Sequence, residues 1–181
     1  IRLIRASLSK LTTTYLSGKS INIKLTFKDG KPVPDYDFVL ILTKGKKTKY
    51  YYPSTNSKGI YNFKASTLDV GTYKLKTSED KTTTTLKITK AKTTVKAPKV
   101  TNKYKKSKNF KVTVKNKATK KAVKNTYVKI KIDKKTYKIK TNSKGIAKFN
   151  TKKLKIGKHK VVISSGNSNY IMSAKSTITI K

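Results

Sequence analysis

The 181-residue sequence predicts an all-β protein made of two tandem β-sandwich domains of about seven strands each. Three observations support this fold class. Apolar residues alternate with polar ones in short runs, a block of sequence recurs after 86 residues, and turn-forming residues separate the runs at intervals typical of short strands. No segment of useful length has helical periodicity.

The alternation is clearest in three segments, 21–27, 128–132 and 178–180. Each places Ile, Val, Leu or Phe at every second position, with Lys, Thr or Asn between them. A period of two puts the apolar side chains on one face of a strand, so that this face packs on a core and the other meets water. A disordered lysine-rich chain has no reason to keep this phase, so we expect a folded protein.

An internal repeat divides the chain. The string Thr-Asn-Ser-Lys-Gly-Ile occurs at 55–60 and again at 141–146. An interval of 86–92 residues is too long for a solenoid unit and suits one β-sandwich. We therefore predict domains at 1–90 and 91–181. Further matching pairs are Phe63 with Phe149, Leu68 with Leu154, and Gly71 with Gly157.

Strands are expected in both repeats wherever alternation is bounded by turn residues. We expect Phe63 and Phe149 to be buried equivalents, and likewise Leu68 and Leu154. A Phe149→Ala change should then destabilise its domain by about 3–5 kcal/mol. The predicted strands are 4–8, 20–27, 37–43, 48–53, 60–64, 72–77 and 84–89 in the first repeat, and 93–97, 109–115, 126–132, 135–140, 146–149, 158–164 and 176–181 in the second.

One local motif favours an immunoglobulin-like sandwich. The segment 68–73 contains Asp69, Gly71 and Tyr73 in the spacing of a tyrosine corner, in which a tyrosine hydroxyl bonds to upstream backbone. The second repeat has Gly157 and His159 at the same places. We interpret His159 as a structural replacement of the corner tyrosine, because the sequence shows no partner residue for catalysis or metal binding.

These motifs carry a family resemblance. The Gly-Ile-Tyr/Ala-x-Phe pattern, the corner motif and the run Asn169-Tyr170-x-x-Ser173 before a final Thr-Ile-Thr-Ile strand resemble the tandem Ig-like repeats of prokaryotic surface proteins. With its heavy use of Lys, Thr, Asn and Tyr, the chain is most similar to archaeal adhesin-like proteins of methanogens. The resemblance implies an extracellular, cell-wall-associated array of such repeats.

The composition argues against an enzyme and against a cofactor. There is no cysteine, a single histidine, and only seven Asp and Glu residues, of which Asp133 alone lies in the second repeat. Paired carboxylates or an activated nucleophile are therefore not expected, and neither is a metal site. Thioester and Thr–Gln ester cross-links are excluded because the chain lacks Cys and Gln, while a Lys–Asn isopeptide in the first repeat stays open.

The formal net charge of +39 predicts weak attraction to anionic surfaces, such as cell-wall polymers or a partner cell. Specific nucleic-acid binding is not favoured, because 44 lysines stand against two arginines and no RNA-binding aromatic signature is present. A general polyanion- or nucleic-acid-binding module remains the alternative function. Candidate contact lysines of the second repeat are Lys117, Lys120, Lys121 and Lys124.

The run Tyr50-Tyr51-Tyr52 provides the candidate aromatic contact. Alignment of Tyr50 with Tyr137 sends Tyr50 and Tyr52 inward and leaves Tyr51 exposed, where its ring could stack on a sugar. Tyr170, in contrast, is expected to pack its ring into the core.

The chain contains no apolar run near the roughly 20 residues that a membrane-spanning helix needs, so membrane insertion is not expected. It has no initiator Met, signal peptide or anchor, and we interpret it as a piece of a longer surface protein. Residues 1–90 hold 18 basic and six acidic residues, and 91–181 hold 28 and one. Like charges at the junction favour an elongated, end-to-end pair that serves as a stalk beside neighbouring repeats.

Overall fold

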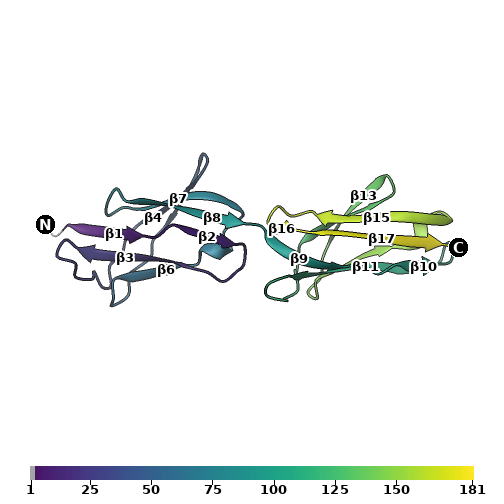
Figure 1. The fold of residues 1–181 in the computed structure, drawn as a ribbon, viewed down its shortest axis with the longest axis horizontal. Helices are drawn as coiled ribbons and strands as arrows, with labels where there is room; N and C mark the ends of the chain where they lie inside the picture. Colours follow the sequence, from purple (N-terminus) through teal and green to yellow (C-terminus); the bar gives the residue numbers. More distant parts are fainter. Residues whose placement is uncertain (1–2) are drawn as a thin grey trace. The chain divides into compact units, whose positions relative to one another are not determined.

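The computed structural model describes residues 3–181, which form two compact units that meet between Thr89 and Lys90, here the N-terminal and C-terminal domains. Each domain is a β-sandwich of two sheets (Figure 1). The all-β, tandem immunoglobulin-like fold expected from the sequence is confirmed.

The N-terminal domain pairs its strands into one three-stranded and one five-stranded sheet, in the orders β1-β3-β6 and β2-β8-β7-β4-β5. Its last turn before β7 is a short 3₁₀ helix, η1. The elements are β1 (Ile4–Leu8), β2 (Leu11–Thr14), β3 (Ile21–Phe27), β4 (Leu40–Lys44), β5 (Lys47–Tyr51), β6 (Ile60–Phe63), η1 (Ala65–Thr67), β7 (Gly71–Thr77) and β8 (Thr83–Thr89).

The C-terminal domain repeats this plan with the sheet orders β14-β11-β9-β16 and β10-β17-β15-β12-β13. A second 3₁₀ helix, η2, precedes β15. The elements are β9 (Ala91–Lys96), β10 (Val100–Asn102), β11 (Asn109–Asn116), β12 (Tyr127–Ile132), β13 (Lys135–Lys140), β14 (Ile146–Asn150), η2 (Thr151–Lys153), β15 (Gly157–Ser165), β16 (Tyr170–Ile171) and β17 (Ser173–Ile180).

Three edge strands were not expected. In each domain the first strand breaks, and the chain crosses to the opposite sheet, where β2 pairs in parallel with β8 and β10 pairs in parallel with β17. A third short strand, β16, pairs in parallel with β9. These strands have two to four residues and almost no apolar alternation, so their backbone pairing left no periodic signal in the sequence.

The repeated string Thr-Asn-Ser-Lys-Gly-Ile forms the same turn in both domains. The Asn56 side-chain oxygen accepts hydrogen bonds from the backbone N–H of Lys58 at 2.9 Å and of Ile60 at 3.0 Å, and Asn142 makes the corresponding pair. The buried Thr141 hydroxyl donates to the Val123 carbonyl at 2.7 Å. The string is therefore conserved between repeats for its local hydrogen bonds, not for a ligand.

Glycine is required in this turn. Gly59 and Gly145 have φ angles of +70° and +73°, and a Cβ atom at either would lie 2.6 Å from the carbonyl oxygen of Leu25 or of Val114. Because both contacts are to backbone, a larger residue would push β3 or β11 out of register.

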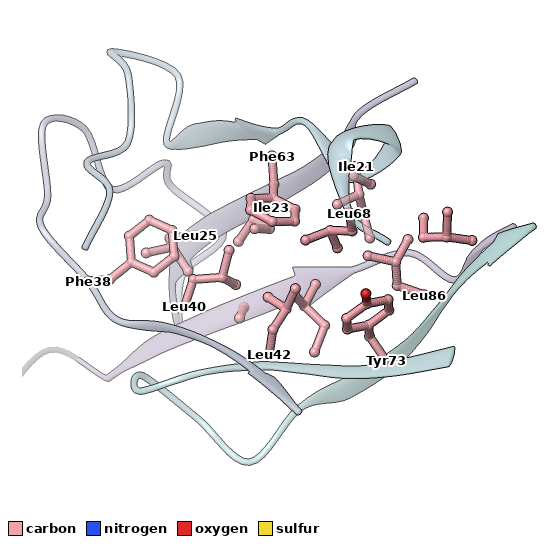
Figure 2. Close-up of a cluster of buried hydrophobic side chains, with 14 of the residues drawn as sticks. Ile21, Ile23, Leu25, Phe38, Leu40, Leu42, Phe63, Leu68, Tyr73 and Leu86 are labelled. Atoms are coloured by element: carbon pink, nitrogen blue, oxygen red, sulfur yellow. The ribbon is translucent and has the colours of Figure 1, made fainter. Parts of the chain in front are cut away.

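The core of the N-terminal domain lies between its two sheets. Figure 2 shows the labelled side chains from both sheets pointing toward one another. Ile23, Leu25 and Leu40 are fully buried, and Phe63 is 6% exposed. The outward neighbours in β3 are Asn22 and Lys24, so the sequence alternation matches the observed phase.

The C-terminal domain fills its core differently. Phe110, opposite Phe149 in the β11–β14 ladder, is fully buried where the N-terminal domain has Ile21 opposite Phe63. Phe149 itself is only half-buried, and so is Leu154. The expectation of equal burial was therefore wrong for the second repeat, because the Phe110 ring takes central volume that the smaller Ile21 leaves to Phe63 in the first.

Candidate functional site

The corner before β7 in the N-terminal domain is closed by a tyrosine. The Tyr73 hydroxyl donates to the Asp69 carbonyl at 2.7 Å, and burial of the ring together with the Asp69 charge raises the pKa of Tyr73. Lys44 covers the corner, because its Nζ donates to the Val70 carbonyl at 2.6 Å and lies 5.2 Å from the ring centroid. Gly71 opens β7 with a φ of +153°.

The same corner in the C-terminal domain is closed by an imidazole. His159 Nε2 donates to the Lys155 carbonyl at 2.8 Å, four residues upstream as in the first domain, and Gly157 opens the strand with a φ of +137°. His159 Nδ1 lies 2.7 Å from Asp133 Oδ2, and the other oxygen of Asp133 accepts from the Lys160 N–H at 3.0 Å. A tyrosine has no counterpart to this second bond.

The two acceptors favour a protonated imidazole. A carbonyl oxygen only accepts, so Nε2 carries a proton, and the Asp133 carboxylate takes a second proton donor in Nδ1. Burial lowers the pKa of His159, but its bonds to Asp133 and Lys155 outweigh this and leave that pKa above the usual 6.5. The bond from His159 lowers the pKa of Asp133.

Asp133 is a partner of His159 that the sequence analysis did not identify. Asp133 lies on the hairpin turn between β12 and β13, 26 residues away, so only the folded sheet brings the two together. Both ring nitrogens are hydrogen-bonded within the corner, which leaves neither free to take a proton from a substrate. Across residues 3–181 no group of three His, Cys, Asp or Glu side chains is placed to hold a metal ion.

The orientation expected for the three tyrosines was also wrong. Tyr50 and Tyr52 are 58% and 79% exposed, whereas Tyr51 points inward and packs edge-on against Phe63 with ring centroids 5.2 Å apart. Tyr51 is therefore not the exposed aromatic that a sugar would meet.

The error is a one-residue slip. In the second domain Tyr137 packs on Phe149 with centroids 4.6 Å apart, so Tyr137 is the equivalent of Tyr51, at the interval of 86 that the repeated string already has. Aligning Tyr137 with Tyr50 moved each side chain to the opposite face. Tyr170, as expected, is buried.

The four candidate lysines lie together in one loop. Lys117, Lys120, Lys121 and Lys124 are all exposed between β11 and β12. The loop is ordered by backbone bonds, with the Asn116 N–H donating to the Lys121 carbonyl and the Lys120 N–H donating to the Asn116 carbonyl, both at 2.9 Å. No aromatic side chain belongs to this loop, so it offers positive charge without a stacking surface.

A different set of lysines surrounds an exposed tyrosine. Tyr127 begins β12 and is 42% exposed. Lys138 Nζ lies 4.5 Å and Lys140 Nζ 5.9 Å from its ring centroid. Lys129 stands directly opposite Lys138 in the β12–β13 ladder. The alternation had already placed these residues outward, but nothing in the sequence indicated that they meet. We refer to Tyr127, Lys129, Lys138 and Lys140 as the Tyr127 platform.

The equivalent positions of the N-terminal domain carry no lysine, and one of them is an acid. Asp37 is opposite Ser54 there, as Tyr127 is opposite Lys140, and the Ser54 hydroxyl donates to the Asp37 carboxylate. Asp37, Tyr52 and Glu79 help to line an open hollow of about 520 Å³. The Tyr36 hydroxyl donates to Glu79 at 3.0 Å, which raises the pKa of Tyr36. The end of the hairpin that carries lysines in the C-terminal domain thus holds a carboxylate and no lysine in the N-terminal domain.

Among the described residues, no helix has the length and apolarity to cross a membrane. No family model matches the sequence, and no curated protein matches it either.

The chain resembles several solved structures. It matches invasin, a bacterial integrin-binding protein, with a TM-score of 0.51 and 12% identity over 98% of this chain and 39% of that one. The Yersinia pseudotuberculosis adhesin InvE gives a TM-score of 0.49 and 16% identity over 97% of this chain and 58% of that one. The titin Ig tandem A164–A165 gives a TM-score of 0.38 and 15% identity, over 98% of this chain and 95% of that one.

The chain therefore spans only about half of the InvE structure and less of invasin. At 12% identity the likeness to invasin shows the fold alone: a tandem of immunoglobulin-like β-sandwich domains.

Proposed function

We propose that this chain is a non-enzymatic, structural and adhesive repeat segment of a cell-surface adhesin-like protein, in which the two domains form part of an elongated stalk. The setting is extracellular, on the cell surface or in the cell wall, next to further repeats of the same kind. Support comes from the resemblance of its motifs to the tandem Ig-like repeats of archaeal adhesin-like proteins, and from the fold shared with invasin, described as a bacterial integrin-binding protein.

The parallel pairing of the first and last strands of each domain is the observation that carries the proposal. β2 pairs with β8 over four residues and β10 with β17 over three. When the two ends of a domain are pulled apart, parallel strands slide in opposite directions, so their hydrogen bonds are loaded together and not broken one at a time. This arrangement suits a segment that transmits force.

Single-molecule stretching of the full chain tests the proposal. A stalk should give two separate unfolding events, each releasing about 300 Å of chain, since an extended residue spans about 3.3–3.6 Å. The Tyr15 N–H donates to the Thr89 carbonyl at 2.9 Å, and backbone N–H direction alternates along a strand, so the Thr13 N–H also faces β8.

Thr13→Pro should therefore lower the unfolding force of the N-terminal domain only, while Thr12→Pro, whose N–H faces away from β8, leaves that force nearly unchanged. Circular dichroism checks that both variants fold, and the second domain serves as an internal reference. Equal unfolding forces for the N-terminal domain in the two variants, or an extension without separate unfolding events, would contradict a role in transmitting force.

Weak attachment to anionic polymers is the second function that an observation favours. The Tyr127 platform places two lysine ammonium groups near an exposed ring, with Lys129 opposite one of them, in a domain that holds one acidic residue. The 44-to-2 excess of lysine over arginine still argues against a dedicated reader of nucleic acid.

A further inference from the structure

The Tyr127 platform has positive charge without a counter-charge in its own domain. Lys129 and Lys138 are directly opposite each other, an arrangement that is unfavourable for two like charges. The only acidic residue of residues 91–181 is Asp133, whose carboxylate is bound by His159 and by the Lys160 N–H. An anion laid across β12 and β13 would relieve this repulsion.

The ring of Tyr127 is open on one flank. Its neighbour on the β15 side is Gly166, whose N–H donates to the Tyr127 carbonyl at 2.9 Å. A Cβ atom at Gly166 would lie 2.8 Å from that oxygen and 2.9 Å from the Tyr127 Cβ. A side chain therefore does not fit at this position, and residue 166 adds none beside the ring.

The fold does not impose this combination. The register-equivalent positions of the N-terminal domain hold Asp37, Val39, Tyr52 and Ser54 in place of Tyr127, Lys129, Lys138 and Lys140. A general lysine bias would place lysine on all outer faces alike. At this end of β12 and β13, an exposed ring, two ammonium groups near it and a third lysine opposite Lys138 occur together.

We propose that the Tyr127 platform binds an acidic polysaccharide, whose sugar rings stack on Tyr127 and whose carboxylates pair with Lys129, Lys138 and Lys140. This rests on the anionic attachment included in the proposed function and specifies its surface and ligand class. The C–H face of a sugar ring suits an aromatic ring, and ammonium groups pair with carboxylates as point charges. Lys138 and Lys140 are two residues apart on one strand, hence about 7 Å, a spacing that successive acidic groups of a flexible polymer can follow.

Lysine in place of arginine argues against sequence-specific nucleic-acid binding, because base edges are best matched by the bidentate guanidinium. The surface is also an open sheet face with a single aromatic, whereas single-stranded nucleic acid is held by successive stacking rings in a groove.

The test measures binding of the full chain to polygalacturonate, a polymer of uronic acid, by calorimetry over a series of salt concentrations. Neutral dextran and duplex DNA are run alongside. The platform variant carries Lys129→Gln, Lys138→Gln and Lys140→Gln. A matched variant carries Lys111→Gln, Lys115→Gln and Lys148→Gln, which removes the same charge from the outer face of the opposite sheet, where Lys111 also stands opposite Lys148 but no aromatic lies between them.

We expect the platform variant to bind polygalacturonate at least tenfold more weakly, and the matched variant less than threefold more weakly. Tyr127→Ala should lose about tenfold and Tyr127→Phe less than twofold, since the ring and not the hydroxyl makes the contact. Thermal melting checks that each variant folds, and all changed side chains are exposed.

An equal loss of polygalacturonate affinity in the two triple variants would overturn the proposal. Binding would then depend on the total positive charge of the chain and not on the lysines of the Tyr127 platform. Duplex DNA binding more tightly than polygalacturonate at physiological salt would also overturn it, in favour of nucleic acid. Neither result bears on the stretching experiment, which uses no ligand, so failure of this inference is distinguishable from failure of the stalk.

Discussion

The two corner residues, Tyr73 and His159, show how one backbone plan accommodates different chemistry. Both side chains donate to a carbonyl four residues upstream, at 2.7 and 2.8 Å. Above Tyr73 lies Lys44, which contacts the ring face, and beside His159 lies Asp133, which binds its second nitrogen. A lysine suits a tyrosine ring and a carboxylate suits an imidazolium, so each corner residue has a neighbour that matches its chemistry.

The length of the neighbouring hairpin decides which residue contacts the corner side chain. β4 and β5 continue to the pair Lys44 and Lys47, whereas β12 and β13 turn earlier, at Asp133, whose φ is +51°. The Asp133 N–H donates to the Lys160 carbonyl at 2.9 Å, which keeps the turn on the adjacent strand. A difference in loop length thus replaces one local interaction with another while the sheet stays the same.

The largest expected difference between the two domains is in the stability that a buried phenylalanine contributes to each hydrophobic core. Phe63→Ala should destabilise the N-terminal domain by about 3–5 kcal/mol, and Phe149→Ala should cost about half of that, because the Phe149 ring is already partly in water. Urea unfolding of the full chain, followed through amide NMR signals of each domain, separates the two losses. Equal losses would show that Phe149 is as well enclosed as Phe63.

An intermediate effect is expected at the corner bonds themselves. Tyr73→Phe removes one hydroxyl hydrogen bond and should cost about 1 kcal/mol at any pH below the pKa of the tyrosine. His159→Tyr keeps the bond to Lys155 and gives up the one to Asp133, so it should cost less than about 1 kcal/mol. The same denaturation experiment measures both, and a larger loss for His159→Tyr than for Tyr73→Phe would contradict the assignment of the corner.

The smallest effect is a pH dependence confined to the C-terminal domain. The pKa of His159 is raised in the folded state, so its contribution is fully present below the unfolded value of about 6.5 and is lost as pH rises through the raised pKa. The pKa of Asp133 is lowered, so its contribution is present above about 3.8 and is lost as pH falls through the lowered pKa.

The pair should therefore stabilise the second domain most between about pH 4 and 6.5. Since Asp133 is half exposed, the gain should stay below about 1 kcal/mol. An NMR titration of the His159 ring should give a pKa above 6.5 that falls toward this value in Asp133→Asn. An unchanged His159 pKa in that variant would show that the ion pair does not form in solution.

Much of the fold could be predicted because it depends on local patterns. The alternation at 21–27 and 128–132 matches β3 and β12 with the expected residues buried, since a period of two admits only one inward face. The prediction for the tyrosine run was wrong because three identical residues show no alternation that tells which side chain points inward. The orientations of Tyr50, Tyr51 and Tyr52 were therefore taken from an alignment with the second repeat, and an error of one residue in that alignment reversed all three.

By itself, the sequence determined the strand phase, the repeat interval, the identical turns at 55–60 and 141–146, and the residues that occupy the two corners, because each is set by residues close together in the chain. Only the tertiary structure decided that Asp133 meets His159, that β2 and β10 cross to the other sheet, and that Tyr127 lies among Lys138 and Lys140. These contacts join different strands, and their register follows from packing and hairpin length, which no local pattern records.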